Sequence, residues 1–284
     1  MKHSDVLAVI VSFNGVHLVP RCAAALRDQV GAIVVADNGS TGETVDILAT
    51  LERETGVMVE RLGGNLGIAR AINVGARKAR ELGYKWLLTM DEDSVADPTM
   101  IDAYMRAVAE DPTRVFLAPL RGDVAATHRK DPHPISYAIT SGNLVRVDLF
   151  DAIGPYENTF FTDCVDFDFS LRARRAGFTI WRVPDAAMAH TVGDVSHSGE
   201  VLARFYTQHS PFRRYYQYRG ILYLTERHAL RFPGFLLKLW LLQALQTALV
   251  VFRDPRPGES YRAMVRGVRD YLARRDAPTT VVVR

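Results

Sequence analysis

The segment Lys85-Trp86-Leu87-Leu88-Thr89-Met90-Asp91-Glu92-Asp93-Ser94 joins a largely apolar run to three consecutive acids. Short apolar runs of this kind are typical of strands that are buried on both faces of a parallel sheet. Carboxylates two residues apart after such a strand can bind a divalent cation, since Mg²⁺ and Mn²⁺ prefer oxygen ligands. The alternative is that the acids only favour the start of the next helix, which begins near Asp97-Pro98.

Similar apolar runs lie on the N-terminal side of this segment. They predict strands at Val6–Ser12, Gly31–Ala36 and Met58–Arg61. Helical patterns alternate with the strands, and they cover Val19–Gln29, Thr44–Gly56, Ile68–Leu82 and Pro98–Glu110. This alternation, which continues to about residue 118, predicts an α/β fold with a mostly parallel sheet. Ligands bind beyond the carboxyl ends of such strands. Polar motifs at 12–14, 37–40 and 91–94 should therefore meet in one crevice.

The bulk composition is that of a globular protein. The chain has 284 residues, of which 48% are hydrophobic and 24% charged. Its two cysteines, Cys22 and Cys164, form neither a disulfide framework nor a metal-binding spacing, which favours a reducing cytoplasm. The first apolar run, Val6–Ser12, is too short for a signal peptide.

Two further motifs suggest contacts to a nucleotide. Asp37 follows the second strand, where its carboxylate could accept a hydrogen bond from a pyrimidine imide or a ribose hydroxyl. The same sequence, Asp37-Asn38-Gly39-Ser40, would also make a good turn with no ligand. The loop Gly64-Asn65-Leu66-Gly67, with Arg70 close behind, precedes a predicted helix, and helix N-termini suit phosphate groups.

Together these motifs resemble the family 2 inverting glycosyltransferases of the GT-A fold, and most closely their rhamnosyltransferase branch. The metal motif of that branch typically has Gln where this chain has Glu92. The resemblance covers roughly residues 6–225, and its motifs are Val11-Ser12-Phe13-Asn14, Asp37-Asn38-Gly39-Ser40, Gly64-Asn65-Leu66-Gly67, Asp91-Glu92-Asp93-Ser94, Ser141-Gly142-Asn143, Phe160-Phe161-Thr162-Asp163 and Val165-Asp166-Phe167-Asp168 with Arg172.

The resemblance implies a GT-A, Rossmann-like sheet flanked by helices, a nucleotide-sugar donor and a divalent metal, Mn²⁺ or Mg²⁺. It assigns donor contacts to Ser12, Asn14, Asp37, Asn65, Gly67, Arg70, Asp91, Ser141 and Gly142. It assigns the metal to Asp91, Asp93 and His190, since a histidine after the last predicted strand can complete such a site.

An inverting transfer also requires a carboxylate that takes the proton of the acceptor hydroxyl. Many relatives carry Glu-Asp-x-Asp four residues before an arginine. Counting back from Arg172 places Asp166 at the base position and puts Val165 where the Glu is expected. Asp163 is the rival base. Without a catalytic role, Asp163 would cap the following helix, and Asp166 would stabilise its first turn.

The C-terminal region differs in charge from the rest of the chain. Residues 200–284 carry 15 basic and 6 acidic side chains, against 20 and 26 in residues 1–199. Phe235–Phe252 has 14 apolar residues out of 18, interrupted too often for a spanning helix. Peripheral membrane contact through 232–256, on the inner face of the cell membrane, fits this pattern. Packing on the catalytic domain or on a second subunit of a homo-oligomer is the alternative.

The sequence thus predicts a GT-A catalytic domain at 1–200, with a nucleotide-binding half at about 1–118 and an acceptor half at about 119–200. A helical C-terminal region follows at 201–284. The leading function is transfer of L-rhamnose from dTDP-L-rhamnose to a polysaccharide or lipid-linked glycan. A UDP-hexose or UDP-galactofuranose donor, or a non-catalytic nucleotide- or glycan-binding module, are the alternatives. A nucleotidyltransferase fits less well because no Gly-rich, basic loop follows the first strand, and no nucleic-acid partner is expected.

Overall fold

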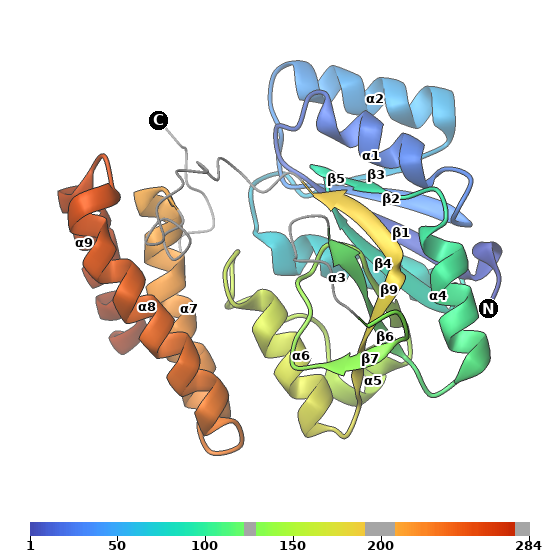
Figure 1. Ribbon diagram of the computed structural model, residues 1–284. Coiled ribbons are helices and arrows are strands. Elements are labelled where there is room, and N and C mark those ends of the chain that lie inside the picture. Colours follow the sequence, from blue (N-terminus) through green and yellow to red (C-terminus); the bar gives the residue numbers. More distant parts are fainter. Residues whose placement is uncertain (122–128, 191–207, 276–284) are drawn as a thin grey trace. The chain divides into compact units, whose positions relative to one another are not determined.

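The computed structural model describes residues 1–121, 129–190 and 208–275 (Figure 1). Within these residues, one compact unit contains 1–121, 129–158 and 165–190. A second unit contains 159–164 and 208–275. The predicted β-α alternation belongs to the first unit, and the predicted C-terminal helices belong to the second.

The first unit contains all the strands among the described residues and most of the helices. Its strands are β1 (Val6–Ser12), β2 (Ala32–Asp37), β3 (Met58–Arg61), β4 (Trp86–Asp91), β5 (Ser94–Ala96), β6 (Phe116–Arg121), β7 (His133–Ile135), β8 (Asn143–Arg146) and β9 (Ile180–His190). Its helices are the 3₁₀ turn η1 (His3–Asp5), α1 (Leu18–Leu26), α2 (Glu43–Thr55), α3 (Ile68–Glu81), α4 (Met100–Glu110), α5 (Leu149–Ile153) and α6 (Val165–Arg175).

These strands form one sheet in the order β3-β2-β1-β4-β8-β6-β9-β5, with β7 paired to β9. Strands β3, β2, β1 and β4 are parallel to one another, which confirms the predicted parallel sheet. Strand β8 then pairs with β4 in the antiparallel sense, so the sheet is mixed beyond β4. The short strand β5 and the pairing of β7 with β9 were not foreseen. Strand β7 begins at His133.

Strand β1 is buried along its whole length because helices cover both faces of the sheet (Figure 1). Val6, Ala8 and Ile10 point into a core shared with α1, α2 and α4. On the opposite face α3 lies so close that a Cβ at Gly75 would overlap Val9. A strand with both faces buried must be apolar at every position, which is why the run lacks a two-residue alternation.

The second unit consists of α7 (Pro211–His228), α8 (Pro233–Arg253) and α9 (Pro257–Leu272), together with the segment 159–164. Helices α7 and α9 pack against each other along most of their length (Figure 1). Phe161 stacks on Tyr216 to form the small aromatic core of this unit. Among the described residues, α8 is the one helix that is long and apolar enough to cross a membrane, and 11% of its most apolar stretch is buried.

Candidate active site

The predicted convergence of three polar motifs is confirmed by the register of the sheet. Ser12, the last residue of β1, lies beside Asp37, the last residue of β2. On the other side of β1, Val11 lies beside Asp91, the last residue of β4. Parallel strands end at the same edge, so the three motifs form one continuous rim.

The turn after β2 is locked to the loop after β1. Asp37 is almost fully buried, and its Oδ1 accepts a hydrogen bond from the Ser40 N–H at 3.0 Å. The Ser40 hydroxyl in turn accepts the Asn14 N–H at 2.9 Å, and the Asn14 side chain accepts the Thr41 N–H at 2.9 Å. The predicted turn is therefore present. Its hydrogen bonds hold the Asp37 carboxylate and the Asn14 amide in fixed orientations at the rim.

The glycine loop before α3 packs directly on this turn. Gly39 has a φ of 79°, and a Cβ there would overlap the backbone of Gly64. The Leu66 N–H donates to the Asn38 side chain at 3.3 Å. Gly67, with a φ of 87°, is the N-cap residue of α3, and Arg70 is exposed in its first turn. The positive end of the helix dipole thus lies beside the rim, where it favours a diphosphate.

Ser141 and Gly142 support the acidic motif from the neighbouring chain segment. The Asp91 N–H donates to the Ser141 hydroxyl at 3.1 Å, and the Ser94 and Ser141 hydroxyls are 2.7 Å apart. Gly142 has a φ of 83°, and a Cβ there would overlap Pro119 and Met188. Ser141 and Gly142, which were predicted to contact the donor, thus lie beside the acidic motif. The buried Ser141 hydroxyl holds the motif from behind.

Glu92, which the sequence analysis did not assign to the site, points toward the loop after β1. Its Oε2 accepts the Phe13 N–H at 3.1 Å. The pKa of Glu92 is raised to about 7, chiefly by burial and also by the neighbouring Asp93 and Asp91, against hydrogen bonds from Ser12 and Phe13 that lower it. A Cβ at Gly15 would overlap the Glu92 carboxylate. The middle acid thus ties β4 to β1.

The acidic motif has the chemistry of a cation site. Burial raises the pKa of the Cys22 thiol, and the charges of Asp91, Asp93 and Glu92 raise it further. All three carboxylates therefore act on one small volume. Within the described ranges, no group of three His, Cys, Asp or Glu side chains is arranged to hold a metal unaided. Mg²⁺ is commonly held by one or two carboxylates plus substrate phosphates, so Asp91 and Asp93 fit an ion that arrives with a diphosphate.

His190 is the last residue of β9, and its backbone pairs with that of Ser94 in β5. This antiparallel pairing brings the end of β9 to the end of the acidic motif, although the two segments are far apart in sequence. Two other histidines of the chain, His128 and His197, lie outside the described residues. His209 belongs to the second unit, where burial, followed by Arg213 and Arg214, lowers its pKa to about 3.

Helix α6 carries the predicted base. The Phe167 N–H donates to Asp166 Oδ1 at 2.9 Å, and Asp166 is partly exposed. Asp168 is fully buried and accepts the Arg172 Nε–H at 2.8 Å. Arg172 also donates to three backbone carbonyls at the end of α5, those of Ile153, Gly154 and Pro155. The Asp168–Arg172 pair is thus structural, and it fixes the first turn of α6 that bears Asp166.

Asp163, the rival base, belongs to the second unit. Its Oδ1 accepts the Arg213 Nε–H at 3.2 Å. Burial raises the pKa of Asp163, and the Arg213 guanidinium opposes this shift. In this unit Asp163 therefore has a fixed ionic partner.

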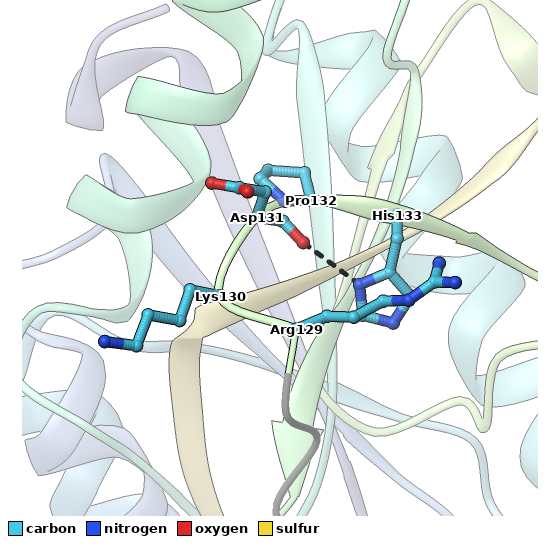
Figure 2. Close-up of a pocket in the computed structure, with 5 residues that line it drawn as sticks. All are labelled: Arg129, Lys130, Asp131, Pro132 and His133. Carbon is cyan, nitrogen blue, oxygen red and sulfur yellow. Dashed lines mark hydrogen bonds between the residues drawn. The ribbon is translucent and has the colours of Figure 1, made fainter.

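A pocket away from the strand ends is lined by one short stretch, shown in Figure 2. The His133 ring Nδ1–H donates to the Asp131 carbonyl at 3.0 Å. None of the predicted site residues lines this pocket, so the pocket and the rim are different features of the surface.

The rim and the sheet define a nucleotide-binding fold, and comparison with known proteins identifies its class. The GT-A glycosyltransferase TarS of S. aureus, crystallised as residues 1–349 with UDP-GlcNAc, superposes with a TM-score of 0.62 over 95% of this chain and 81% of that chain, at 14% identity. GalNAc-T7, crystallised with UDP, GalNAc and Mn²⁺, gives a TM-score of 0.57 over 65% of this chain and 43% of that chain, at 16% identity. The fold is thus that of a GT-A glycosyltransferase, as predicted.

Sequence comparison then identifies the family. The Glycosyl transferase family 2 profile matches residues 7–163, so the chain belongs to this family and is a glycosyltransferase. The dTDP-rhamnosyl transferase RfbF of Shigella flexneri is 28% identical over 250 residues, 80% of this chain and 81% of that protein. The N-acetylglucosaminyl-diphospho-decaprenol L-rhamnosyltransferase of Mycobacterium tuberculosis is 26% identical over 237 residues, 66% of this chain and 76% of that protein.

Proposed function

We propose that this glycosyltransferase moves L-rhamnose from dTDP-L-rhamnose, with inversion, to a polysaccharide or lipid-linked glycan. The observation that carries the proposal is the likeness, over about four fifths of the chain, to a protein named for dTDP-rhamnosyl transfer. The second relative is named for a rhamnosyl acceptor that consists of a sugar on a diphospho-decaprenol, which supports a lipid-linked acceptor.

The rim supplies a surface for each part of the donor. In our proposal, Asp37 and Asn14 bind the nucleoside, because their side chains are held at the ends of β2 and β1. The N-terminus of α3, with Asn65, Gly67 and Arg70, lies beside the diphosphate. Asp91 and Asp93 would hold the divalent ion, Mn²⁺ or Mg²⁺, together with His190. The ion, when bound, neutralises charge that develops on the departing diphosphate.

The proposed chemistry is a single displacement. The acceptor hydroxyl oxygen bonds to the anomeric carbon while the bond from that carbon to the diphosphate oxygen breaks, and dTDP leaves. Asp166 takes the hydroxyl proton, since a carboxylate in this position acts as general base. Its place in the first turn of α6 is fixed by the Asp168–Arg172 pair. Asp163 remains the rival base, although its ion pair with Arg213 occupies the carboxylate and makes it the less suited of the two.

We place catalysis in residues 1–200 and a supporting role in residues 201–284. A polyprenyl-linked acceptor would be held at a membrane by its lipid, and a dTDP-sugar donor would reach it from the aqueous side. We therefore propose that the enzyme is cytoplasmic and contacts the inner face of the membrane through 232–256. The length, apolar composition and slight burial of α8 support this contact.

A donor panel tests the proposed reaction. Release of nucleoside diphosphate is measured for dTDP-L-rhamnose, UDP-galactofuranose, UDP-glucose and UDP-GlcNAc, each with Mn²⁺, Mg²⁺ or a chelator. We expect slow hydrolysis of dTDP-L-rhamnose alone, stopped by the chelator. Preference for a UDP-sugar would refute the assigned donor. Binding without turnover of any donor would identify a non-catalytic module.

A further inference from the structure

The apolar and polar side chains of α8 are placed the opposite way round from those of a helix in a water-soluble bundle. Such a helix normally buries its apolar side chains and exposes its polar ones. In α8 only Leu236 and Val250 are fully buried. Six large apolar side chains are exposed, to between 39% and 81%, and we name them the outer face of α8: Leu237, Leu241, Leu242, Leu245, Val251 and Phe252.

Two polar residues in the C-terminal half of α8, Gln246 and Thr247, contact the other two helices of the second unit. Gln246 accepts a hydrogen bond from Arg214 of α7 at 3.3 Å, and the Thr247 hydroxyl bonds to the Tyr218 hydroxyl. The Tyr261 hydroxyl of α9 donates to the Thr247 carbonyl at 2.9 Å. Polar contacts therefore fix the rotation of α8 about its axis, and this rotation turns the leucines of the outer face away from α7 and α9.

These contacts also exclude a spanning arrangement. They attach the middle of α8 to α7 and α9, which carry buried Arg214 and Arg219 and the exposed Glu226. If α8 crossed a bilayer, it would either lose these hydrogen bonds or bring charged helices into the hydrocarbon, and both are costly. An in-plane position requires neither, because only the outer face enters the lipid.

The charges around the outer face indicate what covers it. Lys238 is exposed on α8 itself, and Arg231 and Arg256 are exposed beyond its two ends. Residues 200–284 carry a net charge of +9. A second copy of this chain would bring the same basic residues against themselves, which opposes a symmetric contact. Anionic headgroups would instead neutralise these basic residues while the acyl chains receive the leucines of the outer face.

We infer that the outer face of α8 is an in-plane docking surface for an anionic lipid bilayer, which rests on, and gives a molecular form to, the proposed membrane contact. The surface consists of the exposed apolar side chains of one helix, and the basic residues around it select negatively charged membranes. It would hold the enzyme where a lipid-linked acceptor is presented without inserting a segment through the membrane.

Vesicle sedimentation of the full chain tests this surface. We expect binding to phosphatidylcholine vesicles that contain phosphatidylglycerol, weak binding to pure phosphatidylcholine, and release by high salt or alkaline carbonate. The variant Leu241→Gln with Leu245→Gln should lower the partition coefficient by about tenfold or more, because both side chains leave the lipid contact. Lys238→Gln with Arg256→Gln should lower it by about an order of magnitude on anionic vesicles only.

Leu82→Gln is the matched control, since Leu82 is 52% exposed in the first unit and should not alter vesicle binding. Unchanged binding of the Leu241→Gln, Leu245→Gln variant would overturn the inference, as would resistance of the wild type to carbonate. If the wild type is a dimer that does not bind vesicles, and the variant is a monomer, the face would be assigned to a second copy of the chain. If the wild type is a monomer that does not bind vesicles, and the Leu241→Gln, Leu245→Gln variant is less stable, the outer face of α8 would be assigned to internal packing.

Donor hydrolysis in vesicle-free buffer separates this inference from the proposed function. Both variants of the docking surface should hydrolyse dTDP-L-rhamnose as the wild type does, because neither changes a residue at the strand ends of the catalytic unit. Vesicle binding without any hydrolysis of this donor would remove the proposed function and leave the surface. Hydrolysis of this donor without vesicle binding would remove the docking surface and leave the proposed function.

Discussion

Arg172→Ala should destabilise the catalytic unit more than any exposed charge substitution in α6. Arg172 donates to the buried Asp168 carboxylate at 2.8 Å and to three carbonyls, at 2.5, 3.2 and 2.9 Å. The Asp168 side chain is 0% exposed and that of Arg172 is 18% exposed, so water cannot readily replace the lost partner. Removal of one member of a buried ion pair costs about 3–5 kcal/mol, because the remaining charge is left uncompensated.

Thermal denaturation provides the assay. In a protein of this size, each kcal/mol lowers the melting temperature by about 2–4 °C, so Arg172→Ala should lower it by about 6–20 °C. Arg175→Ala is the control, since Arg175 is exposed on the same helix. Asp168→Leu combined with Arg172→Leu should be less destabilising than Arg172→Ala, because no buried charge remains. A shift under about 2 °C for Arg172→Ala, equal to that of the control, would refute the assignment of this pair as the support of α6.

The other predictions concern the rim and the proposed base. Asp93→Asn should lower turnover about a thousandfold or more, measured as dTDP release, while leaving the melting temperature without metal unchanged; near-normal turnover would contradict the metal assignment. Asp166→Asn should keep donor binding in a thermal-shift assay and lose transfer, whereas loss in Asp163→Asn with full activity in Asp166→Asn would reverse the two roles. The pKa of Glu92 is raised in the folded state, so the unfolded state releases this proton first and the free energy of unfolding should fall as pH rises from about 4.5 to about 7. In chelator, Glu92→Gln should remove about 3 kcal/mol of that pH dependence, and an unchanged pH profile would show that Glu92 is not buried as described.

The order of strands and helices in the nucleotide-binding half was predictable because buried parallel strands and their flanking helices have strong local signals. Val6–Ser12 and Met58–Arg61 were predicted with the observed bounds, and the other strands and helices before residue 118, apart from η1, β5 and β6, were predicted within two residues, except that α1 ends at Leu26, three residues before the predicted end at Gln29. The convergence of Ser12, Asp37 and Asp91 was predictable for a related reason, since parallel strands carry their final residues to one edge.

Features that depend on contacts between distant segments could not be predicted in this way. The antiparallel β8 and the pairing of β5 with β9 have too few residues for a periodic signal, and only the register reveals that His190 reaches Ser94. Glu92 is one of three adjacent acids, and nothing local shows that it alone turns back to the Phe13 N–H.

The sequence by itself determined the family, the class of fold and the acids that can act, because motif residues and apolar periodicity are local properties of the chain. The tertiary structure decided which of those acids support the fold and which line the rim, since that depends on burial and on partners far away in sequence. It also decided the orientation of α8. Composition showed an apolar helix with four polar residues, but only the hydrogen bonds of Gln246 and Thr247 to the neighbouring helix show that the outer face of α8 points away from the other helices.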